Sequence, residues 1–158
     1  MSKKLIEVKN LKTYFYTEAG TVKAVNNVSF DIYEGEVLGI VGESGSGKSV
    51  TSLSINRLIP NPPGEIVSGE VLYKNKNLLD LSYDEMRNVR GKDIAMIFQE
   101  PMTSLNPVLK IGVQMNEVLI KHENLSEEEA TKRSIEMLTA VGIPEPEQRI
   151  NEYPHQFS

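Results

Sequence analysis

Gly42-Glu43-Ser44-Gly45-Ser46-Gly47-Lys48-Ser49 matches the phosphate-binding pattern G-x-x-x-x-G-K-S/T at every fixed position. The preceding residues, 37–41, form a continuous apolar run, which is typical of a strand covered on both faces in a parallel sheet. Residues 48–59 have apolar side chains at helical spacing, and a proline-rich stretch at 60–64 stops the helix. The sequence therefore predicts a strand, a loop and a helix in that order. The apolar side of this helix is expected to consist of Val50, Leu53, Ile55 and Leu58.

The residue types of the loop suit a polyphosphate. We expect the three glycines to bend the backbone through conformations closed to other residues, so that successive N–H groups point inward. The helix start is expected to add its own unpaired amides. A lysine can bridge the β- and γ-phosphates, and a serine hydroxyl can ligate Mg²⁺. The alternative is a glycine- and serine-rich turn that merely joins a strand to a helix. The nucleotide is expected to contact Gly42, Glu43, Ser44, Gly45, Ser46, Gly47, Lys48, Ser49 and Val50.

Composition excludes several classes of function. The chain has 158 residues, with 17 Lys and Arg against 22 Asp and Glu, and therefore a net charge of −5. The sequence pI of about 5.2 argues against a polybasic surface for nucleic acid. With no cysteine, the chain has no disulfide, thiolate metal site or cysteine nucleophile. No apolar run approaches the roughly 20 residues that span a bilayer, and the N-terminus lacks the apolar region of a signal peptide.

The remaining segments predict β structure first and helices last. Strands are expected at 5–11, 22–32 and 69–74, with a turn at 18–20, and a second buried strand at 93–98. Ser82 and Glu85, like Ser126 and Glu129, have the spacing of a capping box. Helices are expected at 113–123 and 127–141, the second ending at Gly142.

The region around the loop resembles the ATP-binding subunit of ABC transporters. The matching stretches are residues 41–49 and Ile94-Ala95-Met96-Ile97-Phe98-Gln99, which is similar to that family's Q-loop. The continuation Glu100-Pro101-Met102-Thr103-Ser104-Leu105-Asn106-Pro107 resembles the dipeptide, oligopeptide and nickel importer branch. The resemblance implies an α/β P-loop NTPase core of the ABC type, with an N-terminal antiparallel β region and a helical subdomain.

The resemblance also implies ligands and residue roles. ATP and Mg²⁺ are the expected ligands, with Ser49 and Gln99 near the metal and Gln99 orienting the attacking water. The family stacks an aromatic side chain on adenine, and Phe15 takes that place. Tyr14 and Tyr16 are the other candidates, and strand alternation puts them on the opposite face from Phe15.

Other parts of the family's machinery are incomplete in this sequence. We find no apolar strand ending in Asp-Glu and no switch histidine, and the signature motif stops after Phe157-Ser158. The chain is thus expected to be the N-terminal part of an ABC ATP-binding domain, truncated before the signature. Ile97-Phe98-Gln99-Glu100 is not accepted as a substitute for the catalytic strand, and His122 and His155 are expected to have surface or packing roles. The β region would comprise 1–36 and 65–75, the P-loop core with the Q-loop 37–64 and 76–111, and the incomplete helical subdomain 112–158.

The function implied is a transport ATPase that powers import of peptides, or of nickel, through a membrane permease. A second ATP-binding subunit would complete each ATP site, and the Q-loop and helical region would contact the permease at the cytoplasmic face of the membrane. Two alternatives remain: a truncated nucleotide-binding module without ATPase activity, and another P-loop enzyme such as a small-molecule kinase.

Overall fold

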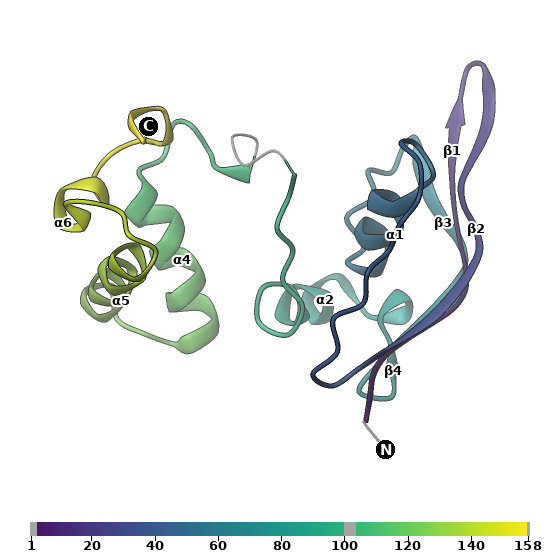
Figure 1. Ribbon diagram of the computed structural model, residues 1–158, viewed down its shortest axis with the longest axis horizontal. Helices are drawn as coiled ribbons and strands as arrows, with labels where there is room; N and C mark the ends of the chain where they lie inside the picture. The colour runs from purple at the N-terminus through teal and green to yellow at the C-terminus, as the bar shows by residue number, and fades with distance from the viewer. Residues whose placement is uncertain (1–2, 100–103, 158) are drawn as a thin grey trace. The chain divides into compact units, whose positions relative to one another are not determined.

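The computed structural model describes residues 3–99 and 104–157, which belong to two compact units (Figure 1). The first unit is Met1–Met86 and the second is Arg87–Ser158. Among the described residues, no helix is both long and apolar enough to cross a lipid bilayer.

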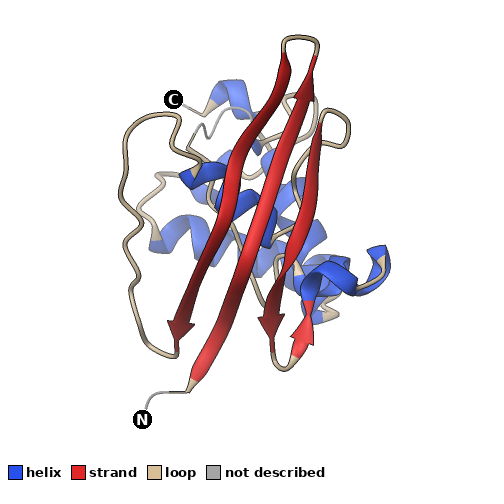
Figure 2. Cartoon of the chain, turned by 90° about the vertical axis from the view of Figure 1, so that its right-hand side faces the viewer, coloured by secondary structure: helices blue, strands red, loops and turns tan. Residues whose placement is uncertain are grey.

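The first unit is built on an antiparallel sheet with strand order β2-β1-β3-β4 (Figure 2). The hairpin of β1 and β2 turns at residues 18 and 19, where the Thr17 hydroxyl donates to the Gly20 carbonyl at 2.8 Å. This sheet confirms the predicted N-terminal β region, and its third strand starts five residues earlier than the sequence indicated. The strands are β1 Lys4–Thr17, β2 Gly20–Tyr33, β3 Gly64–Tyr73 and β4 Lys76–Asn77.

A bulge in β1 decides which side chains face the core. Asn10 has a φ of 48°, and the register with both neighbouring strands shifts there. The buried side chains before the bulge are Ile6 and Val8, two positions apart. The bulge adds one extra residue, so the next buried side chains are Leu11 and Thr13 rather than residues 10 and 12. Gly69 on β3 permits this bulge, because its φ is 116° and a Cβ there would lie 2.6 Å from the Leu11 Cα.

Helix α1, Lys48–Ile55, lies against one face of the sheet and is shorter than predicted. It ends before Arg57, which adopts a φ of 52° and donates from its guanidinium to the carbonyls of Leu78 and Leu81. The predicted apolar side is also wrong in part. Ile55 is buried, but the other buried members of the helix are the hydroxyl residues Thr51 and Ser54. The predicted Val50, Leu53 and Leu58 are only half-buried.

Residues 37–41 and 93–98 do not form the buried strands that the sequence predicted. Within the described residues, neither segment joins a strand ladder, and Ile94 makes only an isolated bridge to Arg90. Val37 is 97% exposed and Ile97 is 98% exposed. A buried parallel strand needs a paired neighbour along its length and cover on both faces, and no described segment forms a strand ladder with either run.

Short elements connect the sheet to the second unit. The 3-10 helix η1, Leu78–Asp80, follows β4, and α2, Tyr83–Val89, comes next. The predicted capping box of α2 is present, since the amide of Glu85 donates to the Ser82 hydroxyl and the amide of Ser82 donates to the Glu85 carboxylate.

The second unit is helical, as expected, with α4 Ile111–Glu123, α5 Glu127–Ala140, α6 Pro146–Arg149 and the 3-10 helix η2 Pro154–Gln156. The capping box of Ser126 and Glu129 opens α5 as predicted. Asn116 of α4 is buried, donates to the Thr131 hydroxyl at 2.7 Å and accepts from the Ser134 hydroxyl at 2.8 Å. This polar network fixes the register of α4 against α5.

Candidate functional site

The phosphate-binding loop lies between the extended segment 37–41 and helix α1. Gly45 has a φ of 80° and Gly47 a φ of 91°, which side chains rarely adopt, so both positions favour glycine. Gly42 does not have a positive φ, and the expectation that all three glycines need such a conformation is wrong for this one. A Cβ at Gly42 would meet the Ser46 hydroxyl at 2.7 Å, so its requirement is for space beside a flexible side chain.

The start of α1 presents unpaired amides. Thr51 supplies the first N–H of the helix that donates to a backbone carbonyl, that of Gly47 at 2.8 Å. The N–H groups of Lys48, Ser49 and Val50 precede it and have no backbone acceptor in the described part of the chain. Unpaired amides at a helix N-terminus, together with the positive end of its dipole, attract an anion. The geometry therefore fits a phosphate group.

Lys48 curls over this loop. Its Nζ donates to the carbonyls of Gly42 at 2.8 Å and Glu43 at 2.7 Å, and lies 3.4 Å from the Ser46 hydroxyl. These contacts hold the ammonium against the first half of the loop. Ser49, the next residue, is exposed, so its hydroxyl is accessible to a metal ion that accompanies a phosphate.

The loop contacts strand β2 of the sheet at a position that the sequence did not indicate. A Cβ at Gly47 would lie 2.1 Å from the carbonyl oxygen of Ala24 on β2. The loop backbone thus rests directly on the strand backbone. No local pattern in the sequence signals this contact, because 23 residues separate the two positions.

Phe15 lies on β1, opposite Val22 of β2 and Gly64 of β3. Its ring covers Gly64, where a Cβ would come within 2.8 Å of the Phe15 Cε1 atom. Tyr14 has different neighbours, since its hydroxyl donates to the Asn26 side chain at 3.1 Å and Lys23 lies over its ring. The assignment of Phe15 to adenine stays a prediction.

Gln99 belongs to the second unit, and it is exposed at the end of the extended segment 94–98. Of the stretch that resembles the importer branch, residues 100–103 lie outside the described residues, as does Ser158 of the signature lead-in. The two histidines have packing neighbours: the His122 ring lies beside Gly91, and His155 stacks on Tyr153 with ring centroids 5.7 Å apart.

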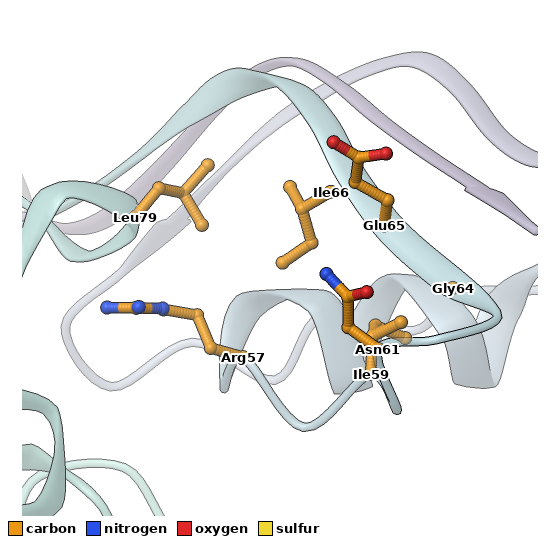
Figure 3. A pocket seen from close by; sticks show the side chains of 7 residues that line it. All are labelled: Arg57, Ile59, Asn61, Gly64, Glu65, Ile66 and Leu79. Atoms are coloured by element: carbon orange, nitrogen blue, oxygen red, sulfur yellow. The ribbon is translucent and has the colours of Figure 1, made fainter. Parts of the chain in front are cut away.

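A separate pocket of about 370 Å³ opens beyond the far end of α1 (Figure 3). Ile59 and Ile66 form apolar walls, and the Asn61 amide projects between them. The pocket contains no residue of the phosphate-binding loop. The described residues that line it are Arg57, Ile59, Asn61, Gly64, Glu65, Ile66 and Leu79.

Comparison with known proteins identifies relatives of the whole chain. A family model described as ABC transporter matches residues 25–158. The oligopeptide transport ATP-binding protein OppD of Bacillus subtilis is 57% identical over 98% of this chain and 43% of its own length. The dipeptide transport ATP-binding protein DppD of the same organism is 53% identical over 98% of this chain and 46% of its own length. The chain therefore spans about half the length of these curated relatives.

Solved structures show the same fold. The dimeric structure of MJ0796, a bacterial ABC transporter cassette, superposes with a TM-score of 0.82 at 31% identity, covering 98% of this chain and 63% of that one. A post-hydrolysis state of the same cassette, bound to ADP and Pi, gives a TM-score of 0.79 at 29% identity, with the same coverage of both chains. These matches confirm the α/β fold of a P-loop NTPase.

Proposed function

Because this chain belongs to the ABC transporter family, we propose that it is part of an ATP-binding subunit that couples ATP binding and hydrolysis to solute import through a membrane permease. The observation that carries the proposal is the row of open amides at the start of α1, in the same loop whose carbonyls at Gly42 and Glu43 hold the Lys48 ammonium. The names of OppD and DppD favour dipeptides or oligopeptides over nickel as the imported solute.

In this proposal, each part of the site has a distinct role. The open amides of residues 48–50 bind phosphate oxygens, and Lys48 neutralises the β- and γ-phosphates. Phe15 stacks on adenine, and Gln99 orients the attacking water. The Ser49 hydroxyl would be a ligand of Mg²⁺, which when bound neutralises the charge of the phosphate oxygens. The assignment of Gln99 to the same metal rests on the family resemblance alone.

Partners follow from the same proposal. A second ATP-binding subunit would complete each site with its signature motif, and the permease would be contacted through the Q-loop and the segment 112–158. The subunit would then be peripheral at the cytoplasmic face of the membrane, with no role for nucleic acid. Because these 158 residues contain no apolar strand ending in Asp-Glu, we propose that they bind nucleotide without hydrolysing it by themselves.

Equilibrium titration with Mg·ATP tests the phosphate site. Lys48→Ala should weaken Mg·ATP binding by about tenfold or more, because a charge-assisted contact to phosphate is lost. Binding of AMP should change little, since AMP lacks the β- and γ-phosphates. Lys92→Ala removes an exposed lysine outside the loop and serves as the matched control. Equal Mg·ATP affinity in the wild type and Lys48→Ala would refute the assignment.

Two further measurements separate the alternatives. Phosphate release by the 158 residues alone, dependent on Lys48, would contradict their proposed inactivity. Transfer of the γ-phosphate to a small acceptor, rather than to water, would favour a kinase instead.

A further inference from the structure

A buried hydrogen bond joins the sheet to the helix of the phosphate site. The hydroxyls of Thr13 on β1 and Ser54 on α1 lie 2.7 Å apart, and both residues are fully buried. The Ser54 hydroxyl donates its single proton to the Val50 carbonyl at 2.7 Å. The Thr13 hydroxyl must therefore be the donor to Ser54.

This bond connects the two halves of the proposed nucleotide site. Thr13 precedes Phe15 by two residues, and β1 pairs with β3 without a register shift from one to the other, so both side chains leave β1 on the same face. The irregularity in the pairing with β2 at this point does not interrupt that alternation, because two residues of β1 face three of β2. Ser54 lies six residues after Lys48, about 9 Å along the helix. The helix is thus attached to the sheet at both ends, by Gly47 against the Ala24 carbonyl and by Ser54 to Thr13.

A hydroxyl pair constrains position more narrowly than apolar packing does. Its oxygen–oxygen distance is confined to a few tenths of an ångström and its direction to the lone pairs of the acceptor, whereas aliphatic surfaces can slide against each other. An apolar pair at these two positions would also bury this side of α1 against the sheet, but it would not fix the position of the helix along the strand. The hydroxyl pair therefore adds a fixed register between β1 and α1.

We propose that Thr13 and Ser54 are positioning residues that hold the ring of Phe15 in register with the phosphate-binding loop. The pair thereby contributes to the affinity for a nucleotide that contacts the Phe15 ring and the phosphate-binding loop at once. It does not contribute to the affinity for the triphosphate group alone. This inference rests on the proposed function, in which Phe15 stacks on adenine and the loop binds the phosphates.

The test compares two ligands, Mg·ATP and Mg·tripolyphosphate, in the complete protein that carries this chain. Thr13→Val keeps the volume and removes the hydroxyl, and Ser54 retains its bond to the Val50 carbonyl. We expect Thr13→Val to weaken Mg·ATP binding by about threefold to tenfold, the equivalent of one hydrogen bond, and to change Mg·tripolyphosphate binding by less than about twofold.

Two variants serve as controls. Thr13→Ser restores the hydroxyl and should recover the wild-type ratio of the two affinities. Thr21→Val makes the same chemical change at an exposed position of β2 and should leave both affinities unchanged. If Thr13→Val does not fold, Ser54→Ala carries the same comparison.

The outcomes separate this inference from the function on which it rests. If Thr13→Val lowers the affinities for Mg·ATP and Mg·tripolyphosphate by the same factor, or changes neither, the ratio of the two affinities stays at its wild-type value. The pair would then have a purely structural role, and the inference would be overturned. Phe15→Ala distinguishes the two levels. If Phe15→Ala lowers the affinity ratio and Thr13→Val does not, only the inference fails. If Phe15→Ala leaves the ratio unchanged, the proposed adenine contact fails and the inference fails with it.

Discussion

Two glycines of the phosphate-binding loop have similar backbones and different surroundings. Gly45 and Gly47 have φ values of 80° and 91°. A Cβ at Gly45 would meet nothing within 4 Å, whereas one at Gly47 would lie 2.1 Å from the Ala24 carbonyl oxygen. The substitutions Gly45→Ala and Gly47→Ala therefore form a matched pair in which only the contact with β2 differs.

The expected magnitudes follow from this geometry. A positive φ with a side chain destabilises either variant by about 1–2 kcal/mol. In Gly47→Ala the contact is about 0.9 Å shorter than the 3.0 Å below which real Cβ contacts essentially do not occur, so loop or strand must move. Such overpacking adds about 1–3 kcal/mol. We therefore expect Gly45→Ala to lose about 1–2 kcal/mol of unfolding free energy and Gly47→Ala about 2–5 kcal/mol.

Urea unfolding followed by far-UV circular dichroism measures both losses, because the chain has no tryptophan for a fluorescence assay. Mg·ATP titration of the same samples then shows whether displacement of the loop weakens nucleotide binding beyond the conformational effect. The reasoning is refuted if the unfolding free energies of the two variants agree within about 0.5 kcal/mol.

Three further predictions concern the helical unit. Asn116→Ala removes the acceptor of the buried Ser134 hydroxyl and should destabilise by about 2–3 kcal/mol in urea unfolding; a loss below about 0.5 kcal/mol would contradict the network. Gly112→Ala places a Cβ 2.8 Å from the Ile150 carbonyl oxygen and should lose about 1–3 kcal/mol by the same measurement; an unchanged midpoint would mean that the helix start can shift freely. Hydrogen bonds from the Ser126 hydroxyl and amide lower the pKa of Glu129, because they favour its ionised carboxylate. The stabilisation of the folded state by these bonds is therefore complete above about pH 5 and is lost as pH falls through the lowered pKa. The stability advantage of the wild type over Ser126→Ala should therefore shrink on acidification, and a constant difference down to pH 3 would disprove the linkage.

Local features of the fold were predictable because their causes lie within a few residues. The capping boxes at Ser82 and Ser126 join residues three positions apart, and the structure forms both. The order of strand, loop and helix around the phosphate site was only half right. The loop and helix formed as expected, but residues 37–41 lack the paired neighbour that a parallel strand needs, and a run of apolar residues cannot supply one.

The candidate site shows the same division. The open amides of α1 and the placement of Lys48 follow from the motif itself. The length of α1 did not, because Arg57 leaves the helix to bond carbonyls more than twenty residues away. The buried face of the helix was also misjudged, since hydroxyls that pair with each other or with the helix backbone can be buried as readily as aliphatic groups.

By itself, the sequence predicted a phosphate-binding loop, because its glycines, its lysine and its serine lie within eight consecutive residues. Only the tertiary structure decided which aromatic side chain shares the helix-facing side of β1. Strict alternation from Ile6 and Val8 would place Tyr14 there, and the bulge at Asn10 moves Thr13 and Phe15 to that face instead. The bulge depends on Gly69 of another strand, so its effect is a long-range one that no local pattern could indicate.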